Sequence, residues 1–230
     1  MIDKLSDRLR KIAVYVPDNA YVADIGTDHG YLPIFLVSQN KAKKVIACDI
    51  REKPLDNARR NIEKSGVSNI ELRLSDGLCN INSDEADTVI IAGMGGDVIA
   101  GILNRSNWIK NDRYFLILQP MTSAEQLRKY LFDNGFETET ESAVEDADKI
   151  YTVITARYSG RALSYSSDML FTGKLDVKNQ TDKKYILKQL NRLKNCIKDI
   201  ENIPSQAEKF KLYSSAVQGI SRILEEKNGI

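Results

Sequence analysis

The sequence predicts an open α/β sheet of mostly parallel strands, followed by a helical hairpin. Strand-like apolar runs alternate with helical segments between residues 20 and 158, the order that gives a doubly wound sheet. The turn Gly26 to Gly30 follows the first strand and opens a helix, as in sheets that bind adenosine-containing ligands. From about residue 180 the apolar spacing changes to heptads. We therefore expect an α/β domain over residues 1–160 and a helical domain over residues 161–230.

Seven strands are expected in the first domain. Each is a short strand-like run bounded by turn residues or by a helical segment. They cover residues 21–25, 44–49, 69–74, 87–92, 114–118, 136–143 and 150–158. Only the acidic turn Glu145 to Asp148 joins the last two, so we expect them to pair as an antiparallel hairpin at one edge of the sheet.

Helices are expected before and between these strands. Residues 3–14 should form an amphipathic first helix that ends before Pro17. The segments 33–39 and 54–64 each begin with proline, which the first turn of a helix accepts because its N–H groups lack partners. A further helix should end at Asn134-Gly135.

The C-terminal domain is expected to be an antiparallel coiled-coil hairpin. Its apolar residues are spaced 4, 3, 4, 3 in one run and 3, 4, 3, 4 in the next, and Pro204 interrupts the chain between the runs. The two runs are Ile186, Leu190, Leu193, Ile197 and Ile200, then Phe210, Tyr213, Val217, Ile220 and Leu224.

Composition limits the class of protein. Apolar residues make up 42% and charged residues 28% of 230, as expected for a soluble globular chain. No run approaches the roughly 18 apolar residues of a membrane span, and the N-terminus lacks a signal-peptide core. The three cysteines are far apart, which suggests neither disulfides nor a metal site. We expect a cytoplasmic protein without metal or membrane partners; the oligomeric state stays open.

Charge is distributed unevenly along the chain. Residues 172–230 hold 12 Lys+Arg against 7 Asp+Glu, a net charge of +5, whereas residues 1–171 hold 21 against 25, a net charge of −4. This asymmetry indicates either a basic arm for an anionic partner or an ordinary solvated helical surface.

The glycine turn favours S-adenosylmethionine over a dinucleotide. A dinucleotide fingerprint needs G-x-G-x-x-G, but here Asp24 precedes Gly26, and Gly30 is the next glycine. An acid at the first position would repel a pyrophosphate and suits a ligand with an ammonium and a sulfonium group. The spacing of the glycines and the acid together favour S-adenosylmethionine over NAD.

Acids lie at or just after the carboxyl ends of three successive expected strands, where open α/β sheets bind ligands. Asp24 is placed for the methionyl ammonium, Asp49 for the ribose hydroxyls, and Asp76-Gly77 for the adenine. Each residue has an alternative: Asp24 and Asp49 as helix caps, and Asp76-Gly77 as an ordinary turn. Their joint occurrence favours the cofactor site.

The run IAGMGGD, residues 91–97, follows the fourth strand and is the candidate acceptor loop, with Gly93 and Met94 at its centre. Its glycines leave the backbone open to a flat substrate, although a flexible turn would also contain them. Gln119 ends the neighbouring strand and is expected either to bind a base edge or to satisfy local backbone.

His29, the only histidine, lies in the cofactor turn between Asp28 and Tyr31. A single histidine is more often structural than catalytic, yet this position favours Asp28 and His29 as residues that line the methyl-transfer cavity. Tyr31 is equally expected to be a packing residue.

Together these motifs resemble one family, the bacterial tRNA (adenine-22-N1)-methyltransferases (the TrmK family). The similar segments run in order over residues 5–158: LSDRLRKIAVYVP, VADIGTDHGYLPI, ACDI, PLDNARRNI, LRLSDGL, DTVIIAGMGG, LILQPM and LRKYLFDNGF. The resemblance implies a class I, Rossmann-like methyltransferase sheet of seven strands with a C-terminal coiled coil. It also implies methyl transfer from S-adenosylmethionine to N1 of an adenine in tRNA.

The resemblance completes the list of expected site residues. The cofactor set is Arg8, Asp24, Gly26, Thr27, Gly30, Tyr31, Asp49, Ile50, Asp76, Gly77 and Gly93. The catalytic set is Asp28, His29, Gly93 and Met94, and the tRNA-binding set is Lys183, Lys184, Lys188 and Arg192.

Three other readings stay open. A methyltransferase for another RNA, a protein or a small molecule would keep the cofactor residues. A non-catalytic adaptor would use only the helical hairpin, and an NAD-dependent oxidoreductase would need the missing third glycine.

Overall fold

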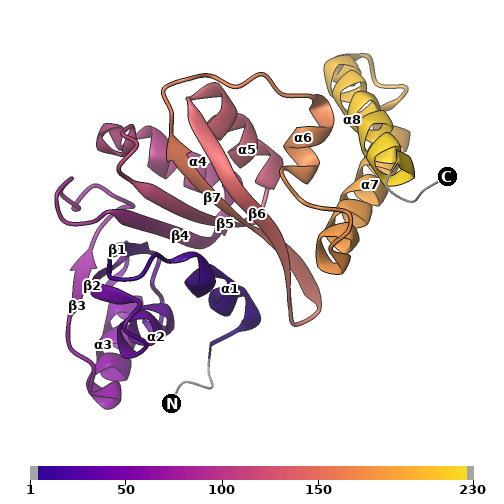
Figure 1. Ribbon diagram of the computed structural model, residues 1–230. Coiled ribbons are helices and arrows are strands. Elements are labelled where there is room, and N and C mark those ends of the chain that lie inside the picture. Colours follow the sequence, from indigo (N-terminus) through magenta and orange to yellow (C-terminus); the bar gives the residue numbers. More distant parts are fainter. Residues whose placement is uncertain (1–4, 227–230) are drawn as a thin grey trace.

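The computed structural model describes residues 5–226 of the chain. One seven-stranded sheet has the order β3-β2-β1-β4-β5-β7-β6. Strands β1 to β5 are parallel where they pair, and β7 is antiparallel to both β5 and β6, as expected for the edge hairpin (Figure 1). The strands are β1 Ala20–Ile25, β2 Ala42–Asp49, β3 Ile70–Leu74, β4 Thr88–Gly95, β5 Phe115–Thr122, β6 Phe136–Asp146 and β7 Lys149–Tyr158.

Helices cover both faces of the sheet. The α-helices are α1 Asp7–Tyr15, α2 Tyr31–Ser38, α3 Glu52–Ser65, α4 Gly96–Asn104, α5 Ala124–Asp133, α6 Ser167–Thr172, α7 Gln180–Ile200 and α8 Ala207–Glu226. Two 3₁₀ turns, Asn107–Ile109 and Pro204–Gln206, join neighbouring elements. Alternate residues of a strand point to opposite faces. Val22 therefore packs with α1 and α2, whereas Ala23 packs with α4 and α5.

Two features differ from the sequence-based expectations. No helix connects β3 to β4, and turns span residues 75–87 instead. The glycines at 93–95 belong to the end of β4, and Gly96 begins α4, so the expected loop 91–97 is a strand-to-helix junction. The first turn of α4 packs closely on Ser123, because a Cβ at Gly96 would lie 2.2 Å from Ser123 O.

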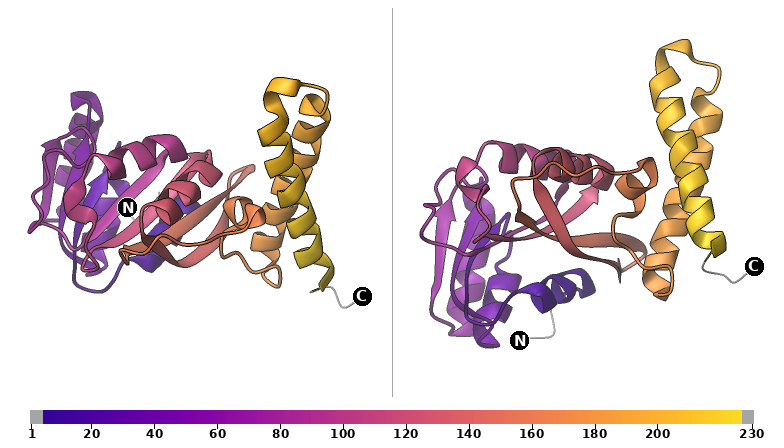
Figure 2. Two further views of the ribbon diagram at one scale, coloured as in Figure 1. Left: turned by 90° about the horizontal axis from the view of Figure 1, so that it is seen from above. Right: turned by 45° about the horizontal axis from the view of Figure 1, so that its top comes forward.

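The C-terminal helices share a core with the sheet domain. Leu170, Ile186 and Ile220 cluster with Phe132 of α5 and Ala143 of β6. A buried ion pair lies beside this cluster: Arg128 of α5 pairs with Glu141 of β6 and donates a hydrogen bond to Leu170 O at 2.7 Å. Helices α7 and α8 form a hairpin that stands at the β6 end of the sheet (Figure 2).

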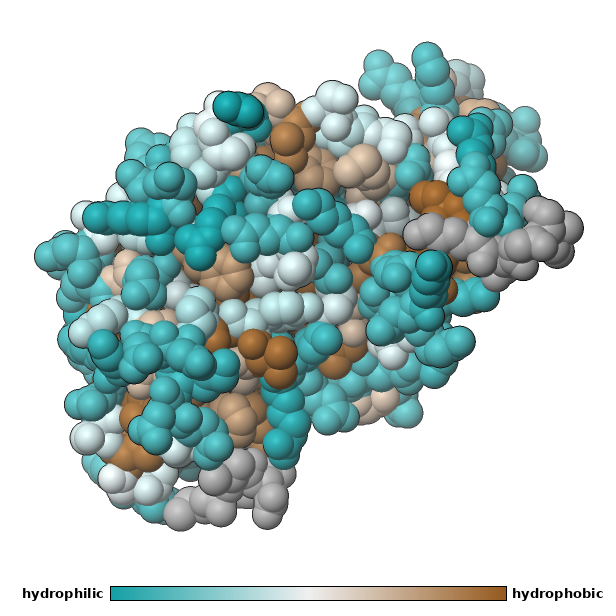
Figure 3. Space-filling view, in the orientation of Figure 1, coloured by the Kyte–Doolittle hydropathy of each residue, from teal (hydrophilic) through white to brown (hydrophobic). Residues whose placement is uncertain are grey.

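Hydrophilic residues predominate on the face shown in Figure 3, and apolar residues appear there as separate patches. Within residues 5–226, no helix combines the length and apolar character needed to cross a membrane.

Candidate functional site

The carboxyl ends of β1, β2 and β4 lie next to two adjoining cavities. The first, the α1 cavity, measures about 210 Å³ and lies between α1 and the turn after β1. The second, the α4 cavity, measures about 680 Å³ and lies between the ends of β2 and β3 and helix α4. Both are lined by Gly26, Asp28, Ala92 and Gly93, so the ends of β1 and β4 separate them.

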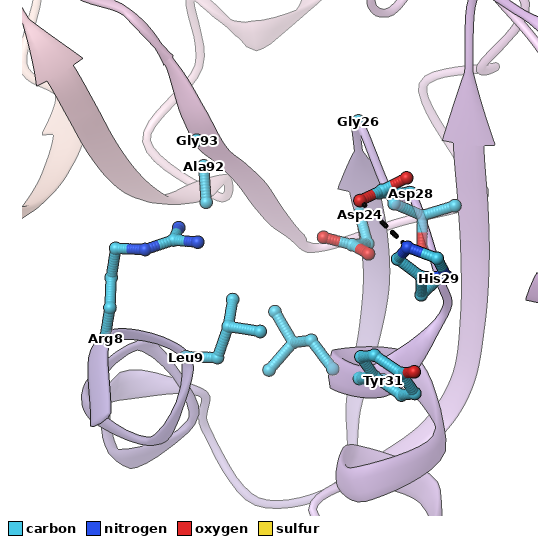
Figure 4. A pocket seen from close by; sticks show the side chains of 11 residues that line it. Arg8, Leu9, Asp24, Gly26, Asp28, His29, Tyr31, Ala92 and Gly93 are labelled. Carbon is cyan, nitrogen blue, oxygen red and sulfur yellow. Dashed lines mark ion pairs between the residues drawn. The ribbon is translucent and has the colours of Figure 1, made fainter. Parts of the chain in front are cut away.

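Arg8 lies opposite the acids of the α1 cavity. Its side chain extends from α1 toward the end of β4, while Asp24, Asp28 and His29 lie across the cavity (Figure 4). Arg8 Nη1 donates to Gln119 Oε1 at 2.7 Å, and Nε lies 3.5 Å from Asp146 Oδ2. The guanidinium is therefore fixed by β5 and the tip of β6, so α1 forms one wall of the cavity.

Asp24 is a buried carboxyl group in the same cavity, only 4% exposed. Burial raises the pKa of Asp24 from 3.8 to about 6, the Thr27 hydroxyl opposes this shift, and the charge of Asp49 adds to it. The Thr27 hydroxyl itself is buried and makes no hydrogen bond of normal geometry within the described chain. The turn thus presents a carboxyl group and a hydroxyl that protein atoms do not fully satisfy.

The α4 cavity contains the two other acids predicted from the sequence. Asp49 is buried at the end of β2, where Oδ1 accepts the Arg51 N–H at 3.0 Å. Asp76 is exposed and accepts a hydrogen bond at 3.2 Å from Nη2 of Arg105, which directly follows α4. Gly77, with φ of +58°, lies against Ile102 so closely that a Cβ would meet its Cγ2 at 2.8 Å.

Gly26 allows Met94 to lie over the turn after β1. Gly26 has φ of +83°, and a Cβ there would lie 2.4 Å from Met94 Cε. The Gly26 N–H donates to Cys48 O at 2.8 Å, which fixes the turn to β2. At the end of β4, the Gly93 N–H donates to Gln119 Oε1 at 3.1 Å.

Asp28 and His29 lie at the mouth of the α1 cavity. His29 Nε2 is 3.5 Å from Asp28 Oδ2, and the imidazole stacks on the Tyr31 ring with centroids 5.4 Å apart (Figure 4). Asp28 has φ of +48°, a conformation that side chains other than Asn and Asp rarely adopt. Both side chains are largely exposed and so accessible to a substrate.

The structure brings together nearly all the expected cofactor and catalytic residues. Arg8, Asp24, Thr27, His29 and Tyr31 line the α1 cavity, Asp49, Ile50, Asp76, Gly77 and Met94 line the α4 cavity, and Gly26, Asp28 and Gly93 line both. Gly30 lines neither. With φ of +69°, it instead allows close packing on α3, where a Cβ would lie 3.1 Å from the Cβ of Ala58.

Some cavity residues were not expected from the sequence. Asp97 of α4 and Arg105, which directly follows α4, line the α4 cavity. Gln119, for which the sequence left a base contact or a local backbone contact open, lines neither cavity; it accepts the Gly93 N–H and connects Arg8 with Gly93. Asp97 directly follows the glycine run, and this position could have indicated that it lines the cavity. The contact of Arg8 with Gln119 joins residues 111 positions apart, and no local pattern predicts it.

The basic residues of the expected tRNA-binding set lie near the start and middle of α7. Lys184, Lys188 and Arg192 follow one another at i, i+4 spacing and share one side of the helix. Lys184 Nζ lies 2.8 Å from Glu145 Oε1, and Arg192 Nη1 lies 3.2 Å from Glu125 Oε1. Lys183, one position away, also has a partner.

No group of three or more His, Cys, Asp or Glu side chains has metal-binding geometry within the described residues.

Comparison with known proteins identifies close relatives. A methyltransferase-domain family model matches residues 5–154. The tRNA (adenine(22)-N(1))-methyltransferase of Bacillus subtilis is 40% identical over 173 residues, which are 75% of this chain and 73% of that protein.

Solved structures agree over nearly the whole chain. The crystal structure of the B. subtilis m1A22 tRNA methyltransferase TrmK has a TM-score of 0.83 at 33% identity, covering 96% of this chain and 98% of that one. A putative tRNA (m1A22) methyltransferase of Streptococcus pneumoniae, in complex with S-adenosyl-L-methionine, has a TM-score of 0.80 at 31% identity, covering 96% of this chain and 99% of that one.

Proposed function

Since the chain belongs to the tRNA (adenine(22)-N(1))-methyltransferase family, we propose that its two adjoining cavities hold S-adenosylmethionine for methyl transfer to tRNA. The enzyme transfers a methyl group to N1 of adenine 22. The observation that supports the proposal most strongly is that Asp24 and Asp49 line two adjoining cavities, which share Gly26 and Gly93, at the carboxyl ends of the strands.

The residues present suit this cofactor. The buried Asp24 carboxylate receives the methionyl ammonium, and the Thr27 hydroxyl, which lacks a partner of normal geometry, gains one. Asp49 accepts from the ribose hydroxyls, beside Ile50. Asp76 and the backbone near Gly77 contact the adenine, a role that requires Asp76 to exchange part of its pairing with Arg105. Arg8 and Tyr31 close the methionine end.

S-adenosylmethionine supplies a methyl group on a sulfonium, and its transfer leaves S-adenosylhomocysteine. Adenine N1 carries an in-plane lone pair, so the protein need not remove a proton before attack. Gly93 would leave the end of β4 open to the flat base, and Met94, which packs over Gly26, lines the α4 cavity that would hold the cofactor. Catalysis is then mostly positioning, which is worth up to roughly 7–11 kcal/mol in favourable cases.

Asp28 is the candidate for electrostatic stabilisation. Its carboxylate borders both cavities and is paired with His29. We assign it to the exocyclic amine of the adenine, where it stabilises the positive charge that forms on 1-methyladenine. His29 orients Asp28.

We assign catalysis and tRNA binding to two different regions of the chain. Residues 1–160 carry the cofactor and the chemistry, and residues 161–230 contribute to tRNA binding through Lys183, Lys184, Lys188 and Arg192. With tRNA as substrate, the place of action is the cytoplasm.

The test uses tRNA transcripts with adenine or guanine at position 22. After incubation with the enzyme and S-adenosylmethionine, mass spectrometry of the nucleosides should show 1-methyladenosine only in the adenine transcript. Equal methylation of both transcripts would reject the position, and no methylation of any tRNA would reject the substrate.

A further inference from the structure

A third cavity lies between the sheet domain and α7. It measures about 230 Å³ and is open to the surface. We call it the α7 groove. Its walls are residues 120–125 at the end of β5 and the start of α5, residues 150–152 of β7, and Tyr185, Lys188, Gln189 and Arg192 of α7.

Basic side chains of α7 and apolar side chains of β5 and β7 line the groove. Lys188 is exposed and makes no ion pair within residues 5–226, whereas Arg192 is paired with Glu125 across the groove. Met121, Ile150 and Tyr151 provide the apolar surface, and Met121 is 37% exposed. The ammonium of Lys188 beside these apolar side chains suits a ligand that joins a negative charge to a flat ring.

One polar atom in the groove lacks a partner. Gln189 Oε1 is buried and makes no hydrogen bond within the described chain, a costly arrangement unless a ligand or water satisfies it. Helix α5 begins beside it without a side-chain cap from Ser123, whose φ is +53°. The uncapped amides at a helix N-terminus favour an anion.

The groove lies next to the acceptor site. Thr122, in its wall, pairs in register with Gly95 of β4, and neighbouring strands are about 4.8 Å apart. Gly93 and Met94 precede Gly95 directly. A base at the end of β4 and a nucleotide in the groove are therefore close enough to be neighbours on one RNA strand.

We propose that the α7 groove binds the nucleotide adjoining the target adenine, with its flanking phosphate on Lys188 and Arg192 and its base on Met121 and Tyr151. This inference rests on the proposed function. In this proposal α7 positions adenine 22 through the neighbouring nucleotide, in addition to attracting the tRNA by its positive charge. Arg192 must exchange part of its pairing with Glu125 to reach the phosphate.

The test combines one substitution with a neutralised phosphate. Lys188→Ala, in a helix position that accepts alanine, should raise the KM for tRNA roughly tenfold and leave the affinity for S-adenosylmethionine unchanged. The slope of log affinity against log salt should fall by about 0.7–0.9, the loss of one phosphate contact. Lys194→Ala, an exposed lysine of α7 outside the groove, is the matched control and should keep parent values.

Ligated tRNAs with a single methylphosphonate on the 5′ or the 3′ side of adenine 22 then locate the contact. One of them should weaken the parent enzyme but add nothing to Lys188→Ala. If the parent enzyme methylates tRNA while Lys188→Ala keeps its KM and salt slope, or if the two changes are additive for both tRNAs, the groove assignment is wrong and the proposed function stands. If the parent enzyme methylates no tRNA, the proposed function itself fails.

Discussion

Arg8 and Gln119, 111 residues apart, meet in a hydrogen bond of 2.7 Å between Nη1 and Oε1. The same Gln119 oxygen accepts the Gly93 N–H at 3.1 Å, and Gln119 Nε2 donates to Pro120 O at 2.8 Å. Gln119 is fully buried, so these bonds satisfy its amide. One side chain therefore holds the first helix against the end of β4.

Arg8→Ala should weaken S-adenosylmethionine binding roughly tenfold, because it removes the wall of the α1 cavity and leaves Asp146 and Gln119 without their partner. Isothermal titration measures the change. Arg10→Ala, on the same helix but outside the cavity, is the control and should bind like the parent chain. Equal weakening by both substitutions would mean that α1 acts only through its stability.

The raised pKa of Asp24 predicts pH-dependent cofactor binding. The carboxyl group must lose its proton to pair with the methionyl ammonium, so affinity should fall tenfold per pH unit below about 6 and level off above it. Asp24→Asn should bind weakly at every pH and lose this dependence. A parent affinity that is constant from pH 5 to 8 would contradict the assignment of Asp24.

The same group should also make the free protein less stable as pH rises from about 4 to 6. Its folded pKa lies above the unfolded value of 3.8, so the folded state binds more protons in this range, and their release destabilises it. Asp24→Asn should therefore raise the free energy of unfolding at pH 7.5 by at most about 3 kcal/mol. Denaturant unfolding without ligand measures it, and a destabilised Asp24→Asn protein would refute the cost assigned to Asp24.

The sequence located the edge of the sheet that carries the two cavities, because the signal there is local. Asp24, Asp49 and Asp76 each lie at or just after the carboxyl end of a strand, and parallel topology alone brings such positions together. The heptads likewise predicted α7 and α8, whose residues Leu190, Leu193 and Ile220 are buried. Residues 1–4, where the first helix was expected to begin, lie outside the described residues.

Long-range polar contacts could not be predicted in this way. Nothing near Arg128 in the sequence distinguishes it from a surface residue of an amphipathic helix, yet it is fully buried against Glu141. Helix α6 was missed because six residues are too few to show a helical period. Gly30 was assigned to the ligand on its spacing, and its close packing on Ala58 was not predicted.

Asp28→Ala should lower kcat at least tenfold with little change in the affinity for S-adenosylmethionine, since we assign the carboxylate to the charge that forms on the base. Asp49→Ala should instead act on affinity and abolish measurable binding of S-adenosylmethionine. Single-turnover methylation and titration separate the two effects. Parent turnover in Asp28→Ala would remove its catalytic role. Asn tolerates the positive φ of residue 28, so Asp28→Asn controls for backbone strain.

Arg128→Met should destabilise the protein by about 3–5 kcal/mol, because it leaves the Glu141 carboxylate buried without its counter-charge. Both side chains are 0% exposed. Lys129→Met, which breaks the exposed pair with Asp133 on the same helix, should cost only about 0.3–0.5 kcal/mol. Chemical denaturation measures both, and similar costs would show that the buried pair contributes no more than the exposed one.

A crystal structure with S-adenosylhomocysteine tests the central claim most directly. We predict the amino-acid end of the ligand at Asp24 in the α1 cavity, its ribose at Asp49, and its adenine near Asp76 in the α4 cavity. A ligand bound outside these two cavities, or one whose adenine lies at Asp24, would contradict the account.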